Sequence, residues 1–144
     1  MGRQWMRLDN AALIFPAVRR RGWSNAFRMT ATLREDVDPQ VLQQAVEDLM
    51  PRFPSMFVRL RAGAFWYYLE QIDRAPQVRQ DYAYPLTHMD GKSLRSCCLR
   101  VLYYRKRIAV EFFHSLTDGT GGLIFLKTLT ARYLERKYGI SVPA

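Results

Sequence analysis

The sequence predicts an α/β sandwich in which helices pack on a mixed, partly antiparallel sheet. Three patterns indicate this class: one alternating apolar run, two apolar stripes at helical spacing, and two pairs of β-favouring runs separated by short turns. Of the 144 residues, 49% are hydrophobic, and a chain of this length can bury roughly two thirds of its unfolded surface in one core. We therefore expect one domain with the order β-α-β-β-β-β-α.

The first strand and the first helix follow one another closely. Residues 25–33 alternate between apolar and polar side chains, which is typical of a half-buried strand. Asp38 then supplies a helix N-cap, and Pro39 suits the first helical position. Pro51 ends this helix. Its apolar stripe consists of Val41, Leu42, Ala45, Val46 and Leu49.

Two hairpins follow the first helix. Residues 56–61 and 64–70 are rich in aromatic and β-favouring side chains, which predicts a hairpin. Residues 93–104 and 107–115 form the second hairpin, and its strands are apolar on nearly both faces, as central strands are. The turn-forming residues at 84–92 predict a loop between the two hairpins.

A long helix is predicted after the second hairpin, at 120–138. Gly139 closes it as a C-terminal cap. No internal repeat and no low-complexity linker divides the chain. The apolar face of the helix consists of Leu123, Phe125, Leu126, Leu129, Tyr133 and Leu134.

The net charge of +9 attracts acidic partners of many kinds and does not choose among them. The basic clusters at 19–21 and 105–107 are predicted to be solvated turn residues. The argument for nucleic-acid binding rests only on net charge and aromatic content, and no predicted helix is basic along one face. We therefore expect no nucleic-acid partner.

Cys97 and Cys98 are adjacent, so on a strand they point to opposite faces and cannot easily form a disulfide. They also lack partners for a zinc site, and we expect two buried apolar side chains and no metal. No uncharged run approaches the ~20 residues that span a bilayer, and the start has no signal-peptide core. The expected location is the cytoplasm.

His114 is the strongest candidate for chemistry. Alternation puts it on the same face as Ile108, Val110 and Phe112, at the end of an apolar strand. The Gly-rich turn that follows leads into a helix N-terminus, which favours negative charge. A neutral imidazole there can accept a proton from a nucleophile. The alternative for His114 is a strand-end histidine bonded only to backbone, and His88, which precedes Asp90-Gly91 in a polar segment, is interpreted as a turn residue.

The segment Phe113-His114-Ser115-Leu116-Thr117-Asp118-Gly119 resembles the His-x-x-x-Asp-Gly (HxxxDG) signature of the chloramphenicol acetyltransferase-like superfamily. This superfamily includes condensation domains of peptide synthetases and CoA-dependent acyltransferases. Other parts of the chain are similar to bacterial proteins described as alcohol acetyltransferases, so the resemblance covers nearly all of it. These parts are residues 7–12, 51–54, 65–70 and 125–129.

The resemblance implies a role for each motif residue. His114 would be the general base that deprotonates an acceptor alcohol or amine. Asp118 would be mainly structural and paired with an arginine, and Gly119 would keep the channel beside the histidine open. Many relatives carry a second histidine at the position of Phe113, but the catalytic one corresponds to His114. The co-substrate would be an acyl-CoA or an acyl carrier protein thioester, and no bound cofactor is expected.

The resemblance also implies an incomplete fold. Family members place the histidine between two similar halves, so residues 1–144 are expected to be the N-terminal subdomain, inactive without the C-terminal one. Whether the chain is an enzyme in itself therefore stays open. The alternative is a non-catalytic interaction module that binds a partner chain or its own copy. Because a cut domain leaves an apolar face, we expect a homodimer formed near His114 and the second hairpin.

Overall fold

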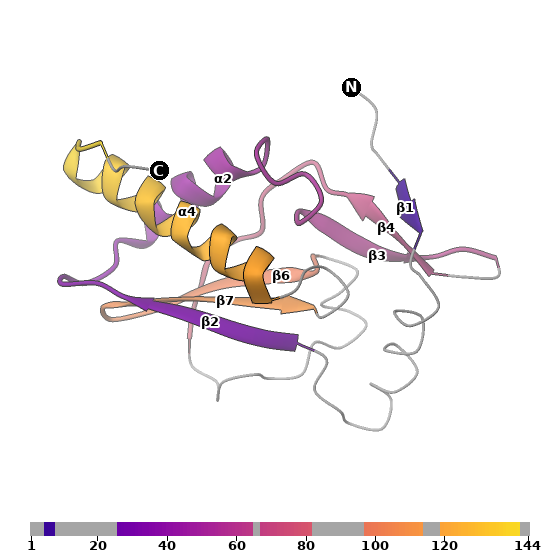
Figure 1. Cartoon of the computed structure of the whole chain (residues 1–144), viewed down its shortest axis with the longest axis horizontal. Coiled ribbons are helices and arrows are strands. Elements are labelled where there is room, and N and C mark those ends of the chain that lie inside the picture. The colour runs from indigo at the N-terminus through magenta and orange to yellow at the C-terminus, as the bar shows by residue number, and fades with distance from the viewer. Residues whose placement is uncertain (1–4, 8–25, 65–66, 82–96, 114–118, 142–144) are drawn as a thin grey trace.

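The computed structural model describes residues 5–7, 26–64, 67–81, 97–113 and 119–141. Within them it contains seven strands and two helices (Figure 1). In chain order these are β1 (Trp5–Arg7), β2 (Ala26–Thr32), α2 (Pro39–Leu49), β3 (Val58–Ala62), β4 (Tyr67–Gln71), β5 (Arg79–Gln80), β6 (Leu99–Tyr104), β7 (Arg107–Phe113) and α4 (Gly119–Tyr138).

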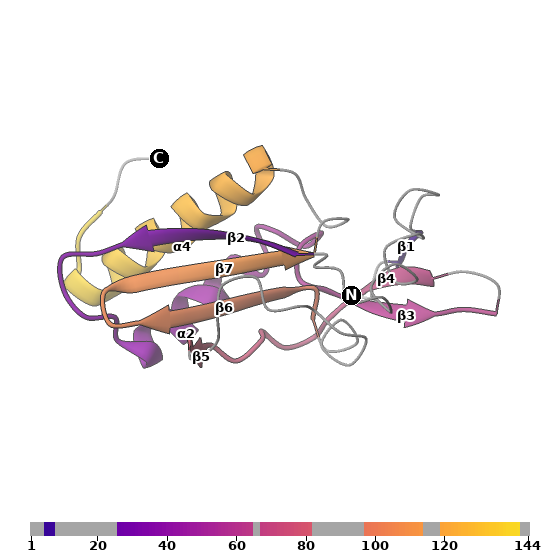
Figure 2. The same ribbon diagram turned by 90° about the horizontal axis from the view of Figure 1, so that it is seen from below.

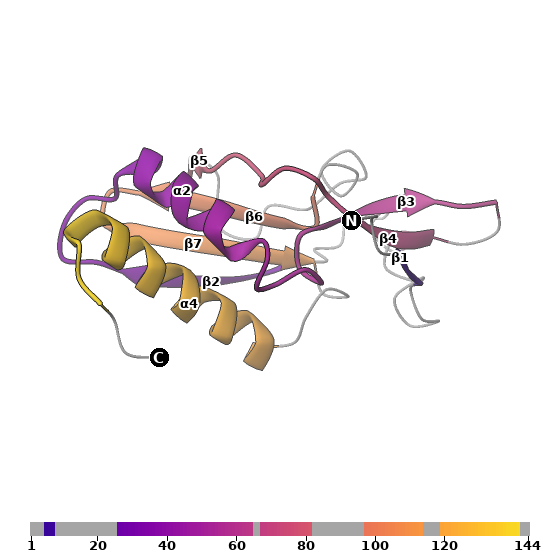
Figure 3. The same cartoon turned by 90° about the horizontal axis from the view of Figure 1, so that it is seen from above.

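The main sheet has four strands in the order β2-β7-β6-β5. Neighbouring strands in this sheet are antiparallel, except for β5 and β6, which are parallel. Both described helices cover one face of this sheet, with α4 over β2 and β7 and α2 towards β6 (Figure 3). The opposite face carries neither helix (Figure 2). The predicted mixed, partly antiparallel sheet with helices packed on it is confirmed.

The first predicted hairpin is also confirmed, but it does not join the main sheet. β3 and β4 pair with each other, and β4 pairs with β1, which gives a separate antiparallel sheet in the order β1-β4-β3. This second sheet lies beyond one end of the main sheet (Figure 1). The two are linked where the backbone N–H of Cys98 donates to the carbonyl of Val58 at 2.8 Å.

The hydrophobic core lies between the main sheet and the two helices. Alternation along β7 places Ile108, Val110 and Phe112 on the helix side, and all three are completely buried. Phe125 of α4 is at the centre, because its ring contacts Phe112 edge-on at a centroid distance of 5.7 Å. Two further rings, of Phe53 and Phe57, pack against Phe125 at 5.1 and 5.8 Å.

Helix α2 begins and ends as predicted. The Asp38 carboxylate accepts from the backbone N–H of Gln40 at 3.0 Å and of Val41 at 3.3 Å, which satisfies two N–H groups of the first turn. Of the predicted stripe, all but the half-buried Val41 are fully buried. Tyr133 of α4 connects this helix to the N-cap of α2, since its hydroxyl accepts from the backbone N–H of Asp38 at 2.8 Å.

Helix α4 begins at Gly119, one residue earlier than predicted. Gly139 follows it with a φ of 67°, the left-handed conformation that glycine adopts easily at a C-cap. The two helices are joined on their outer side by Asp48 of α2, whose carboxylate accepts from Arg132 at 2.7 Å and from Arg136. These pairs lower the pKa of Asp48, chiefly through the hydrogen bond from Arg136.

Two short strands are not predicted by the sequence pattern: β1 and β5. The predicted strand at 93–104 is seen from Leu99 onward, and residues 93–96 and the predicted loop at 84–92 lie outside the described residues. Between β6 and β7 the turn is Arg105-Lys106, as predicted, and Arg105 has a φ of 52°.

Candidate functional site

The two elements that flank the HxxxDG segment are both well defined. Strand β7 ends at Phe113 and helix α4 begins at Gly119, so residues 114–118 connect a central strand to a helix N-terminus. His114 and Asp118 themselves lie outside the described residues. The arginine partner predicted for Asp118 and the roles predicted for both residues therefore stay predictions.

Gly119 is exposed and is the first residue of α4. A Cβ atom built at Gly119 would meet no atom of the described residues within 4 Å, and the φ of Gly119 is not in the left-handed region. The backbone conformation therefore does not require glycine at this position. Phe113, at the other end of residues 114–118, is completely buried. The backbone N–H of Phe113 donates to the Cys98 carbonyl at 3.0 Å.

One turn into α4, the helix touches the sheet directly. A Cβ atom at Gly122 would lie only 3.2 Å from ring atoms of Phe112 and of Phe27, and 3.3 Å from the sulfur of Met29. The rings of Phe27 and Phe112 are stacked with their centroids 5.2 Å apart. The end of β7 and the start of α4 are thus packed against one another, which fixes both ends of the connection that carries His114.

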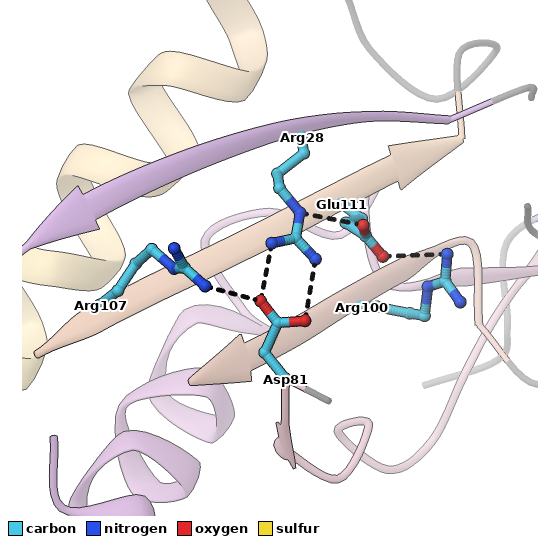
Figure 4. A network of polar contacts seen from close by, with 5 residues as sticks. All are labelled: Arg28, Asp81, Arg100, Arg107 and Glu111. Carbon is cyan, nitrogen blue, oxygen red and sulfur yellow. Dashed lines mark hydrogen bonds and ion pairs between the residues drawn. The ribbon is translucent and has the colours of Figure 1, made fainter. Parts of the chain in front are cut away.

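The helix-free face of the main sheet holds a network of five charged side chains (Figure 4). Arg28 of β2 donates two hydrogen bonds to the carboxylate of Asp81, at 2.7 and 3.2 Å, and a third from Nε to Glu111 of β7 at 3.1 Å. Arg100 of β6 reaches Glu111 at 2.9 Å, and Arg107 reaches Asp81 at 3.2 Å. The side chains of Asp81 and Glu111 are each 2% exposed.

The contact between Arg28 and Asp81 shifts the pKa values of both residues. The hydrogen bond from Arg28 holds the pKa of Asp81 below its ordinary value, and that bond in turn raises the pKa of Arg28. Each carboxylate is bound by two guanidinium groups, so neither is available as a general acid or base. The network instead connects β2, β7, β6 and the residue after β5 on the helix-free face of the sheet. One of these strands, β7, leads to His114.

The sequence pattern does not predict this network. Arg107 was interpreted as a solvated turn residue, and this is wrong: the residue is half-buried and paired with Asp81, whereas Arg105 and Lys106 are exposed as expected. The one local signal was Glu111, a carboxylate inside an otherwise apolar strand. Its partners lie far away in sequence and no spacing rule could identify them. The predicted turn cluster at 19–21 lies outside the described residues.

The two cysteines are buried, as predicted, and they do not form a disulfide with each other. Burial raises the pKa of the Cys97 thiol to about 11, so it is a poor nucleophile at neutral pH. Among the residues that the structure describes, no group of three His, Cys, Asp or Glu side chains could hold a metal ion. Within the same residues, neither helix has the length and apolar character needed to cross a bilayer.

No family model matches the sequence, and no curated protein matches it either. Solved structures do match its fold. The starter condensation domain of rhizomide synthetase aligns with a TM-score of 0.69 at 10% identity, over 98% of this chain and 40% of that one. The first condensation domain of the calcium-dependent antibiotic synthetase gives 0.66 at 15%, over 98% and 40%.

A polyketide synthase associated protein also matches. Polyketide synthase associated protein 5 from Mycobacterium tuberculosis aligns with a TM-score of 0.66 at 18% identity, over 96% of this chain and 36% of that one. The chain therefore spans about a third to two fifths of the length of these neighbours. The chain has the fold of one part of a condensation domain, as expected from the resemblance of residues 113–119.

Proposed function

We propose that this chain is the histidine-bearing, N-terminal part of an acyltransferase that moves an acyl group from a CoA or carrier-protein thioester to an alcohol or amine. Two independent observations support the proposal. The fold is that of a portion of condensation domains, and the HxxxDG segment connects the central strand β7 to the N-terminus of α4. The position of the segment in this fold is the observation that carries the proposal.

His114 would act as the general base. Its neutral imidazole takes the proton of the acceptor O–H or N–H while that oxygen or nitrogen attacks the thioester carbonyl carbon. The C–S bond then breaks, and the departing thiolate receives the proton from the imidazolium. The reaction needs no oxidant and no metal in this scheme, and the thioester is a co-substrate.

The start of α4 supplies a second contribution. Backbone N–H groups at a helix N-terminus, together with the helix dipole, favour negative charge close to them. The tetrahedral intermediate of acyl transfer carries such a charge on its oxygen. No atom of the described residues lies within 4 Å of a Cβ atom built at Gly119, and the missing side chain would leave room there for a substrate atom.

Residues from outside the chain would complete the site. The neighbours are more than twice as long as the stretch they share with this chain, and we expect the remainder of the fold to supply the opposite wall of the acyl-transfer site. The donor and acceptor would then bind between the two parts. The acyl-transfer assay therefore has to use this chain together with such a second part, either in one polypeptide or added in trans.

The test compares the two histidines of the chain. In the assembled protein, His114→Ala should lower kcat about 100-fold or more with little change in donor affinity, since only proton transfer is lost. His88→Ala is the matched control and should leave kcat unchanged. Release of free thiol from an acyl-CoA measures the rate. An unchanged kcat in His114→Ala would remove His114 from the mechanism.

A further inference from the structure

The helix-free face of the main sheet, which Figure 2 shows, carries a group of basic residues where β6 turns into β7. Arg79, Tyr104 and Arg107 each lie next in sequence to a residue that packs against the core, so alternation places them on the helix-free side. The guanidinium of Arg105, in the turn, lies over the ring of Tyr104 at 5.3 Å from its centroid. We call this group the basic face.

Two arginines of the basic face carry charge that no carboxylate of the described residues neutralises. Arg79 and Arg105 are both exposed, and neither forms an ion pair within the described ranges. The arginines on the outer side of α4 differ, because Arg132 and Arg136 share the carboxylate of Asp48. The charge of Arg79 and Arg105 is therefore available to a ligand.

Asp81 lies on the same side of the sheet but does not neutralise these two charges. Its carboxylate accepts from Arg28 at 2.7 Å and from Arg107 at 3.2 Å, and its side chain is 2% exposed. Arg28 alone makes hydrogen bonds to both carboxylate oxygens. Asp81 thus holds Arg107 in place and leaves the neighbouring Arg79 and Arg105 without a partner.

Two further carboxylates, Glu35 and Asp36, follow β2 in the chain. Glu35 accepts from the hydroxyl of Tyr138 of α4 at 2.8 Å, which directs it towards the helix side of the sheet. In the part of the chain that the structure describes, neither carboxylate forms an ion pair with Arg105. The basic face therefore remains positively charged.

The turn keeps an arginine where the backbone suits a different residue. Arg105 has a φ of 52°, in the left-handed region that glycine and asparagine adopt most easily. Two-residue hairpin turns usually carry Asn or Gly at such positions. Residues held in strained conformations cluster at functional sites, so the retention of a charged side chain here favours a function for that charge.

We propose that the basic face binds an acidic segment of a partner protein, in which several Asp or Glu side chains recur on one side. Such side chains are about 6–7 Å apart in a helix or a strand. The arginines of the basic face extend from β5 to β7, across about 10 Å of the sheet at about 4.8 Å per strand. This width exceeds the reach of one small anion and suits a row of carboxylates, each of which can accept two hydrogen bonds from a guanidinium.

Other polyanions fit the basic face less well. Single-stranded nucleic acids bind by stacking their bases on open aromatic rings. Here the ring of Tyr104 already contacts the guanidinium groups of Arg105 and Arg107, at 5.3 and 5.8 Å. Membrane surfaces are bound by apolar side chains inserted beside the cations. No large apolar side chain of β5, β6 or β7 other than Tyr104 is exposed.

The basic face is remote from the segment that carries His114. It lies at the first residue of β7, and residues 114–118 follow the last one. A strand of this length extends about 20 Å. A partner bound to the basic face does not have to enter the acyl-transfer site, and the proposal therefore does not depend on the proposed function.

Fluorescence anisotropy tests the proposal with a labelled peptide that alternates glutamate and serine, in about 50 mM salt, where surface charges are weakly screened. The whole chain should bind this peptide and should not bind its counterpart with glutamine in place of glutamate. The double variant Arg79→Gln/Arg105→Asn should bind about tenfold more weakly. Its melting temperature should not fall, because asparagine suits the positive φ of the turn.

The matched control is the double variant Arg52→Gln/Lys127→Gln. It removes the same charge from exposed residues that lie after α2 and on α4, away from the basic face, and should bind within about twofold of wild type. Equal weakening in the two double variants would overturn the proposal, because net charge alone would then explain binding. No binding of the glutamate peptide by the wild-type chain would also overturn it.

Single-stranded DNA and vesicles that contain anionic lipid are the competing probes. Both should bind the wild-type chain more weakly than the glutamate peptide does. If either binds more tightly and Arg79→Gln/Arg105→Asn abolishes that binding, the basic face serves nucleic acid or membrane, and the proposal of an acidic protein segment is wrong.

Discussion

The Cys97 thiol, with its pKa of about 11, should not react while the chain is folded. At pH 8 only about one thiol in a thousand would be ionised, and the thiolate is the reactive form. Cys98 is also completely buried. We expect iodoacetamide at pH 8 to modify neither cysteine in the native chain and both in denaturant, as measured by mass spectrometry. Rapid labelling of the native chain would contradict the described packing around these residues.

Asp81 makes stability depend on pH in a defined direction. Its pKa is lower in the folded chain than in the unfolded one, so its contribution is present above the ordinary carboxyl value of 3.8 and is lost as the pH falls below it. Asp81→Asn should lower the melting temperature at pH 7, since it leaves Arg107 without this partner and Arg28 with only Glu111, at a cost of about 3 kcal/mol.

The difference between wild type and Asp81→Asn should shrink as the pH falls below the ordinary carboxyl value of 3.8, because the unfolded chain then binds a proton at Asp81 and the folded chain binds one only at its lower pKa. Thermal melts followed by circular dichroism measure both effects. Asp36→Asn is the matched control, since Asp36 is exposed, and should change the melting temperature little. A constant difference across this pH range would show that charge on Asp81 is not what stabilises the network.

Asp118 is predicted to be a scaffold residue paired with an arginine of this chain. Asp118→Asn should then lower the melting temperature and the acyl-transfer rate together, because a buried arginine would lose its partner at a cost of about 3–5 kcal/mol. Thermal melts and rates on the same preparations provide the comparison. Lost activity with an unchanged melting temperature would indicate that Asp118 contacts the substrate instead.

Among the elements, α4 depends most on one small residue. Gly122→Ala would place a methyl group against Phe27, Phe112 and Met29 at 3.2–3.3 Å, and the stacked rings have little room to move. Alanine favours helix by about 1 kcal/mol over glycine, but overpacking costs about 1–3 kcal/mol. We expect a net loss of about 1 kcal/mol in thermal or urea unfolding. Gly119→Ala should show no loss, because no atom of the described residues lies within 4 Å of a Cβ atom built there.

Elements with a strong local pattern were predictable from sequence. The N-cap Asp38 and the apolar stripe after it define α2, and the two-residue turn at Arg105-Lys106 defines the β6–β7 hairpin. The short strands β1 and β5 were not predictable, because only pairing with distant strands makes them strands. The separation of the β3–β4 hairpin into its own sheet was not predictable either, because it also depends on pairing with a distant strand, β1.

The site was predictable only in part, for a related reason. The HxxxDG segment is local, and its position between β7 and α4 follows from the flanking periodicities. The ion network is not local: Arg28 is 53 residues from Asp81 and 83 from Glu111. Contacts at such separations arise from the topology of the whole sheet, and a single sequence carries no pattern that predicts them.

For the molecule as a whole, we expect the chain alone to show no acyl transfer and to gain it when the remaining part of the fold is supplied. The reason is that neighbours of this fold extend well beyond the shared region. Free-thiol release, with and without the second part, is the measurement. Full activity of the isolated chain would show that its own residues complete the site.

The pairing of β2 with β7 has a consequence for biosynthesis. The last residue of β2, Thr32, pairs with the first residue of β7, Arg107, so 75 positions separate two strands that are neighbours in the sheet. Ribosomes add about 5–20 residues per second, and β2 therefore emerges about 4–15 s before its partner has been made. During this interval both edges of β2 are uncovered, and nascent chains on one messenger are close together. Translation speed across residues 33–113 would then determine how much of the protein reaches its native sheet.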